Sequence, residues 1–249
     1  MNEFKVLGVR VNGVQIPGVV ETVRQWIRDR GPARFIAVTG MHGVMEAQQS
    51  DEFRQVLADA DLVVPDGTPL VWMGRRYGFN LRRRVYGPEL METFLRETRG
   101  AYRHFFYGGA EGVADQLAVV LQKKFDIQVA GTWCPPFRAL SAAEESEIAA
   151  LIEETKPDIV WIGLSTPKQE RWMHAHRNLH APVMIGVGAA FDFHTGRAVQ
   201  APVWMRENGL EWLFRLLSEP RRLWRRYIIL GGKFGWNVTL QLLGWRDFS

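Results

Sequence analysis

The chain has 249 residues, of which 47% are hydrophobic and 23% charged, and this composition excludes an intrinsically disordered, collagen-like or long coiled-coil protein. Its single cysteine, Cys134, excludes an internal disulfide framework and a multi-cysteine zinc site. The net charge of +4 lies entirely between Glu211 and Ser249, a segment with seven Lys or Arg against three acids. A neutral body with a basic end is untypical of nucleic-acid-binding proteins, whose basic residues spread over a reading face.

From Arg34 onward, apolar runs of strand length alternate with segments of helical period. The runs predict strands at Arg34–Val38, Asp61–Val64, His104–Tyr107, Ile127–Ala130, Ile159–Gly163 and Val183–Val187. The segments between them predict helices at Val44–Leu57, Pro88–Arg99, Gly112–Phe125, Ala142–Thr155 and Pro167–Arg177. Unbroken apolar strands separated by helices indicate an α/β fold of Rossmann-like type, with a mostly parallel sheet covered by helices on both faces.

The composition changes near residues 201–209, which predicts an α/β core over residues 1–209 and a helical appendage over residues 210–249. The appendage holds four of the ten tryptophans, and on a helical wheel its four arginines between positions 221 and 226 lie opposite apolar residues. Such a basic amphipathic helix fits a lipid surface with anionic head groups, and it equally fits a helix packed on the core with a solvated arginine face. The chain shows no secretory signal and no uncharged, strongly apolar 18-residue run, so we expect a cytoplasmic protein without a membrane-spanning helix.

In a parallel sheet the ligand crevice lies outside the carboxyl ends of the strands, so the residues that follow each strand are candidates for a site. They offer a hydroxyl (Thr39), a carboxylate (Asp66), a glycine-rich turn (Gly108 and Gly109) and an amide beside a lysine (Gln169 and Lys168). That combination suits a nucleotide-linked substrate and a general base.

Asp66 is the candidate for the base. It lies between Pro65 and Gly67, in a turn beside an apolar strand that would partly desolvate the carboxyl and raise its pKa. The alternative is an Asx turn or an N-cap for a helix that starts near Thr68, which is the commoner role of an aspartate at such a place.

The Gly108-Gly109 turn, with Gly112 three residues later, follows a strand and opens a helix, so its backbone N–H groups can approach a phosphate. A tight turn from strand to helix needs glycine in any case. The motif lacks the first glycine of the dinucleotide fingerprint, and no ribose-binding acid ends the next strand, which disfavours a nicotinamide cofactor.

Three further patterns are set aside. Asp59 and Asp61 resemble a two-aspartate metal motif, but they precede their strand and so lie at the wrong edge of the sheet. Ser165 is followed two residues later by proline, where a nucleophile elbow needs glycine. His174 and His176 point to different sides of a helix, and no H-E-x-x-H motif is present, so no metal site is expected.

With these residues in view, the sequence resembles the WecG/TagA/CpsF family of bacterial glycosyltransferases, which build teichoic-acid linkage units, enterobacterial common antigen and exopolysaccharides. Five stretches carry the resemblance, in family order. They are ADLVVPDG (60–67), RVYG (84–87), GLSTPKQE (163–170), GVGAAFD (186–192) and EWLFRLLSEPRR (211–222).

The resemblance implies inverting, metal-independent transfer of a sugar from a UDP-sugar to a polyprenyl-diphosphate-linked saccharide. The enzyme would act at the inner face of the plasma membrane and would need no cofactor. The resemblance is also compatible with a homo-oligomer. Asp66 would take the proton from the acceptor hydroxyl, with Thr39 and Gln169 beside the substrates. The implied substrate-binding residues are Arg84, Gly108, Gly109, Gly163, Lys168, Gly188 and Asp192. The appendage arginines Arg215, Arg222 and Arg225 resemble the family's C-terminal set and would stabilise the leaving UDP, because guanidinium groups bind phosphates in a bidentate, always-charged manner.

One position departs from the family. Met41 stands where many members carry an asparagine, which leaves the donor open among N-acetylmannosamine, its uronic acid and glucose.

Two other functions compete with transfer. A catalytically inert, membrane-associated scaffold that keeps the nucleotide pocket would not need Asp66, Thr39 and Gln169 together. A soluble nucleotide-dependent oxidoreductase that uses residues 108–112 would leave the tryptophan-rich appendage unexplained.

Overall fold

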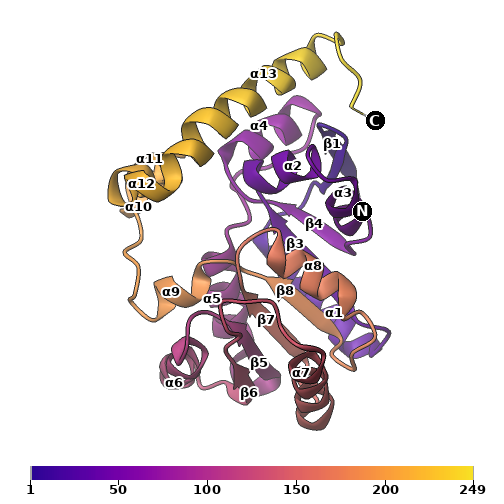
Figure 1. Cartoon of the computed structure of the whole chain (residues 1–249), viewed down its shortest axis with the longest axis vertical. Helices are drawn as coiled ribbons and strands as arrows, with labels where there is room; N and C mark the ends of the chain where they lie inside the picture. Colours follow the sequence, from indigo (N-terminus) through magenta and orange to yellow (C-terminus); the bar gives the residue numbers. More distant parts are fainter. Residues whose placement is uncertain (1, 249) are drawn as a thin grey trace.

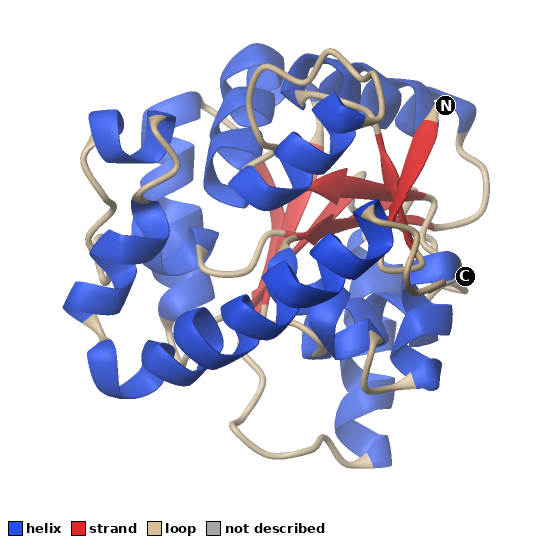
Figure 2. Cartoon of the chain, turned by 90° about the horizontal axis from the view of Figure 1, so that it is seen from above, coloured by secondary structure: helices blue, strands red, loops and turns tan. Residues whose placement is uncertain are grey.

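A computed structural model describes residues 2–248 and is built around a six-stranded parallel sheet. The strands are β3 (Arg34–Thr39), β4 (Leu62–Pro65), β5 (Arg103–Gly108), β6 (Gln128–Trp133), β7 (Ile159–Gly163) and β8 (Val183–Gly186). Their order across the sheet is β4-β3-β8-β7-β5-β6. All six predicted strands and their parallel pairing are confirmed (Figures 1 and 2).

Helices cover both faces of this sheet, as predicted. One face packs against α1 (Ile16–Asp29), α5 (Gly87–Thr98), α6 (Val113–Phe125) and α9 (Ala190–His194). The other packs against α2 (Met41–Ala47), α3 (Asp51–Ala58), α4 (Thr68–Arg76), α7 (Ala142–Thr155) and α8 (Lys168–Ala175). In β3, Phe35 and Ala37 belong to one core and Ile36 and Val38 to the other. A strand buried on both faces has no polar side, which explains the unbroken apolar runs.

The structure differs from the sequence prediction at the start of the chain. An antiparallel hairpin of β1 (Glu3–Val6) and β2 (Val9–Asn12) precedes α1, and neither was predicted. The single helix predicted at Val44–Leu57 is wrong, because α2 and α3 are separate helices. The hydroxyl of Ser50 caps α3 by accepting a hydrogen bond from the backbone N–H of Phe53 at 3.1 Å, which starts a new helix there.

The appendage consists of short helices that cross the top of the molecule in Figure 1. They are α11 (Glu211–Ser218), α12 (Pro220–Trp224), the π-helical segment η2 (Arg225–Leu230) and α13 (Gly231–Leu242), and the short helix α10 (Val203–Glu207) precedes them at the end of the core. A 3₁₀ turn, η1 (Arg99–Ala101), follows α5 in the core. The helix α12 begins at Pro220, a residue that suits the first turn of a helix. Among the described residues, no helix is long and apolar enough to span a membrane.

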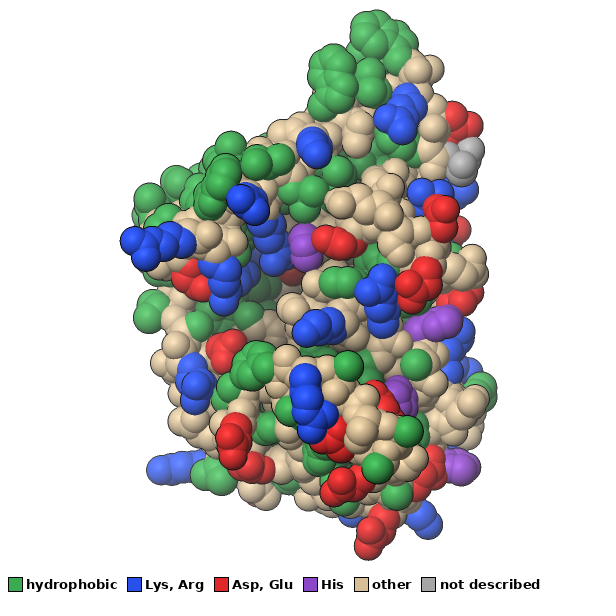
Figure 3. Space-filling view, viewed as in Figure 1, with side chains coloured by type: hydrophobic (Ala, Val, Ile, Leu, Met, Phe, Trp, Pro, Cys, Tyr) green, Lys and Arg blue, Asp and Glu red, His purple; other side chains and the backbone are tan. Residues whose placement is uncertain are grey.

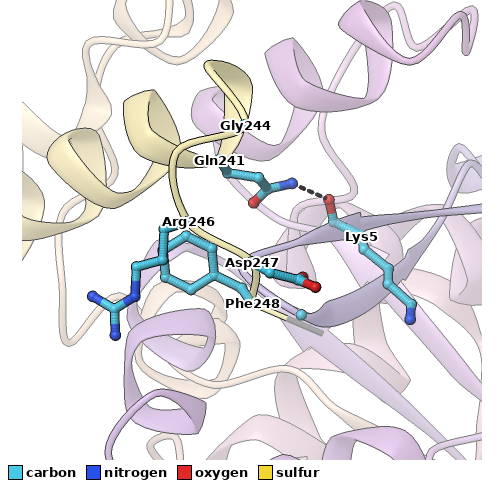
Figure 4. A pocket seen from close by; sticks show the side chains of 7 residues that line it. Lys5, Gln241, Gly244, Arg246, Asp247 and Phe248 are labelled. Atoms are coloured by element: carbon cyan, nitrogen blue, oxygen red, sulfur yellow. Dashed lines mark hydrogen bonds between the residues drawn. The ribbon is translucent and has the colours of Figure 1, made fainter.

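The appendage docks on the core. Leu223 and Phe234 are buried, and the side-chain amide of Gln241 in α13 binds the turn between β1 and β2. Its oxygen accepts from the backbone N–H of Leu7 at 2.7 Å, and its nitrogen donates to the carbonyl of Lys5 at 3.0 Å (Figure 4). The last helix is therefore held against the first hairpin. Of the apolar residues on the wheel, Leu223 is buried, whereas Trp224 and Ile228 are exposed, as Arg225 is.

Candidate active site

The carboxyl ends of the strands bring the predicted site residues into one row. The sheet order places Asp66, Thr39, Gly188, Gly163 and Gly108 at or just after the ends of β4, β3, β8, β7 and β5, respectively. The turns after β3 and β4 pack tightly, since the backbone N–H of Asp66 donates to the carbonyl of Thr39 at 2.9 Å. Gly40 is required beside them, because a Cβ there would lie 2.7 Å from the Asp66 carbonyl oxygen.

The Asp66 carboxyl has one oxygen that is shielded from solvent and makes no hydrogen bond within the described residues. Its side chain is 30% exposed, but Oδ1 is cut off from solvent and has no hydrogen-bond partner among the described residues. Its pKa is raised to about 6, chiefly by burial and also by the charge of Glu211, against the opposing charges of Arg84, Arg215 and Arg226. The helix α4 is capped at Gly67 without a side-chain hydrogen bond, which argues against the capping role for Asp66.

Arg84 lies beside this carboxyl. Its Nη1 is 3.5 Å from Asp66 Oδ1, its Nη2 forms an ion pair with Glu211, and its guanidinium stacks on the ring of Tyr86 at 4.1 Å. The segment is held in place because the backbone N–H of Val85 donates to the carbonyl of Pro65 at 2.8 Å. Two separate stretches of sequence thus meet at the end of β4.

The appendage arginines divide into two groups. Arg215 and Arg226 are partly buried, and each is close enough for its charge to lower the pKa of Asp66. Arg222 and Arg225 are exposed: Arg222 Nε lies 2.9 Å from Glu219, and the Arg225 guanidinium lies 5.5 Å from the centre of the Trp224 ring. The structure therefore brings Arg215 to Asp66 together with Arg226, which the sequence analysis did not select.

Gln169 binds the turn that follows β8. It is buried, its Oε1 accepts from the backbone N–H of Gly188 at 3.1 Å, and its Nε2 donates to Glu170 Oε1 at 3.0 Å. Its amide thus fixes the Gly188 turn from behind. Lys168 is exposed at the first position of α8.

The glycines at the ends of β5 and β7 have packing reasons of their own. Gly108 and Gly163 are register partners, and a Cβ on Gly108 would lie 2.7 Å from the Gly163 backbone. Gly109 takes a φ of 77° and donates its N–H to the Gly163 carbonyl at 3.0 Å. Asp192 lies half-buried on α9.

Thr39, at the end of β3, and His42, in α2, carry buried polar atoms near the end of the strand. His42 Nε2 lies 3.2 Å from Glu46 Oε1, while burial and the charge of Arg226 lower the pKa of His42 to about 4. The Thr39 hydroxyl and His42 Nδ1 are buried without hydrogen-bond partners in the part of the chain that the structure describes. Buried polar atoms of this kind normally bind a partner, so these two atoms are available to a ligand.

The acidic pair Asp59 and Asp61 lies at the opposite end of β4 from Asp66, as predicted. Asp59 Oδ2 lies 2.8 Å from His174 Nε2, and Asp61 Oδ2 accepts from the backbone N–H of Phe35 at 2.9 Å. Both carboxylates thus have structural partners. Within residues 2–248, no group of three or more His, Cys, Asp and Glu side chains is arranged to hold a metal ion.

Comparison with known proteins gives one family. The model of the Glycosyl transferase WecG/TagA/CpsF family matches residues 4–247. The N-acetylglucosaminyldiphosphoundecaprenol N-acetyl-beta-D-mannosaminyltransferase of Bacillus spizizenii is 31% identical over 203 residues, which are 80% of this chain and 77% of the relative. The proteins of the same name from Bacillus subtilis and Staphylococcus aureus (strain MRSA252) are 29% and 26% identical, over 71% and 88% of this chain and 68% and 86% of theirs.

Proposed function

The chain belongs to the WecG/TagA/CpsF family of glycosyltransferases, and we propose that it moves an N-acetylmannosamine-type sugar or glucose from a UDP-sugar to a polyprenyl-diphosphate-linked saccharide. The names of the relatives favour N-acetylmannosamine as the sugar and lipid-diphosphate-linked N-acetylglucosamine as the acceptor. The transfer inverts the anomeric configuration and uses no metal.

The observation that carries the proposal is the shielded Asp66 carboxyl with its unpartnered Oδ1 and raised pKa. Asp66 takes the proton of the acceptor hydroxyl while that oxygen attacks the anomeric carbon. The bond from this carbon to the diphosphate oxygen breaks, and UDP leaves with the electron pair. One in-line displacement with one base suffices for inversion.

The departing diphosphate gains negative charge, and cations placed where that charge develops lower the barrier. The partial burial of Arg215 and Arg226 near Asp66 supports this role for them. Arg222 and Arg225 stay predictions from the family resemblance. The same arginines support metal independence, because they supply the positive charge that a divalent ion would otherwise provide. Thr39, Arg84, Gln169 and the glycine turns would shape the pocket around the donor.

The outer side of the appendage supports attachment to a membrane surface at the inner face. Large apolar side chains are exposed along it, and Figure 3 shows them along the upper edge of the molecule, with basic side chains below. They are Trp212, Leu217, Trp224, Ile228, Ile229, Trp236, Leu242, Leu243 and Trp245. Contiguous exposed apolar surface flanked by basic residues is typical of a lipid-binding face.

The test is a panel of UDP-sugars incubated with a short-chain lipid-diphosphate N-acetylglucosamine acceptor, with UDP release and product mass as readouts. We expect release and a product one sugar heavier, with the same rate in EDTA. Activity lost to EDTA and restored by Mg²⁺ or Mn²⁺ would contradict the metal-free mechanism. Saturable UDP binding without product for every sugar would favour the inert scaffold.

A further inference from the structure

Glu211 is a buried carboxylate contributed by the appendage to the core. It is the first residue of α11 and only 5% exposed. Its Oε2 pairs with Arg84, and its Oε1 accepts a hydrogen bond from the hydroxyl of Tyr86 at 3.0 Å. A carboxylate removed from water needs such partners for both oxygens. Glu211 is therefore held in a defined position.

Arg84 is shared between two carboxylates. The guanidinium forms the closer contact with Glu211, while its Nη1 stays 3.5 Å from Asp66 Oδ1, without a hydrogen bond. If Glu211 lost its charge, Arg84 would be free to close on Asp66. The ion pair that Arg84 Nη1 already forms with Asp66 Oδ1 at 3.5 Å would then shorten to a hydrogen-bonded one, which would stabilise the Asp66 carboxylate and make it a poorer proton acceptor.

We propose that Glu211 is a positioning residue that holds Arg84 toward the appendage and thereby keeps the Asp66 carboxylate free to accept a proton. The inference rests on the proposed role of Asp66 as the base. It makes the docked appendage part of the proton-transfer machinery, in addition to its arginines. On this proposal, Asp66 is an effective base only while α11 is docked on the core and Glu211 contacts Arg84.

The charges around Asp66 predict the direction in which its pKa changes when Glu211 is replaced. Arg84 from the segment after β4, together with Arg215 and Arg226 from the appendage, lowers the pKa of Asp66, and Glu211 is the neighbouring acid that raises it. Tyr86 and His42 lie one step further out, against Arg84 and Arg226. Removing the Glu211 charge therefore lowers the pKa of Asp66, both directly and through the release of Arg84.

The experiment measures kcat/KM against pH for the unmodified protein, Glu211→Gln and Glu211→Asp. Glu207→Gln is the matched control, because Glu207 pairs with Arg83 across the same two segments but both side chains are about half exposed, at 49% and 58%. For Glu211→Gln we expect the pH below which kcat/KM declines, the acidic limb of the profile, to shift to lower pH by about half a unit or more. We also expect the plateau value of kcat/KM above this limb to fall about tenfold. For Glu211→Asp, which keeps the charge but shortens the reach, we expect a lower plateau with the limb nearly in place. Glu207→Gln should leave both features as in the unmodified protein.

The outcomes separate the two proposals. An unmodified protein that transfers no sugar to the lipid-linked acceptor overturns the proposed function. A protein that transfers normally, with a Glu211→Gln limb that does not move, overturns the role of Glu211 alone. If Glu211→Gln fails to fold, as judged by circular dichroism, Glu211→Asp decides: a plateau equal to that of Glu207→Gln contradicts the role.

Discussion

Arg225 and Arg226 are consecutive residues, but only Arg226 is partly buried and acts on Asp66, whereas Arg225 is exposed over the ring of Trp224. Both lie in the π-helical segment η2. A π turn closes its hydrogen bonds over five residues instead of four, so side chains in it do not follow the rotation of a regular helix. Such segments occur often at functional sites. The contrast between these two arginines provides a matched pair of variants.

We expect Arg226→Ala to lower kcat about 10²-fold or more, by analogy with the loss of one group that stabilises a developing anion. Arg225→Ala is measured in parallel, and the measurement is UDP release with a short-chain acceptor in detergent. An equally large loss for Arg225→Ala would mean that Arg225 also reaches the leaving diphosphate, as the family resemblance implies.

Asp66→Asn should lower kcat about 10²-fold or more while the affinity for the UDP-sugar changes only a few-fold, because loss of a general base typically costs a factor of 10² to 10⁴. Donor binding is followed by calorimetry and turnover by UDP release. Asp59→Asn serves as the control, since Asp59 lies at the other end of β4 and binds His174. Near-normal turnover of Asp66→Asn would reduce Asp66 to a structural residue.

The pH dependence follows from the state of Asp66 that the reaction needs. On the proposed role of Asp66 the carboxylate is the active form, and since its pKa is raised to about 6, we expect activity to be lost as the pH falls through this value. We expect kcat/KM to drop about tenfold per pH unit below the limb. The pKa of His42 is about 4, so this histidine stays neutral over the range and adds no second limb near 6. A kcat/KM profile that stays flat from about pH 5 to about pH 7 would contradict Asp66 as the base.

Attachment to lipid can be separated from chemistry by two exposed apolar residues of the appendage. Ile228 and Trp236 are 57% and 64% exposed, and we expect the double change to glutamate to reduce co-sedimentation with anionic liposomes several-fold. Turnover of a detergent-solubilised acceptor should change little. Val119→Glu, at an apolar position of α6 that is 66% exposed, is the control. Equal liposome binding by both variants would show that the appendage does not contact the membrane through these residues.

The sheet could be predicted because its strands are buried on both faces and leave a continuous apolar signal. The first hairpin could not, since strands of four residues that carry Lys5 and Arg10 leave too short and too polar a pattern. Asp66 could be selected because its turn directly follows a strand whose carboxyl end points to the crevice.

The partners of Asp66 were harder to find. Glu211 lies 127 residues after Arg84, and no local spacing reveals a contact across such a distance. Arg226 was not selected because the other appendage arginines were chosen by their match to the family, and the wheel places Arg226 on the same arc as Arg222 and Arg225. Arg222 and Arg225 keep their place as family-based predictions.

The ion pair between Arg84 and Glu211 also bears on when the molecule becomes competent. The last strand of the sheet ends at Gly186, so the whole sheet precedes Glu211 in the order of synthesis. N-terminal parts of a chain emerge and fold first. On the proposed function, a nascent polypeptide still attached to the ribosome holds a folded sheet but lacks the clamp on Arg84. A chain that ends before Glu211 would also lack Arg215 and Arg226, so on this proposal it would transfer sugar far more slowly than the full chain.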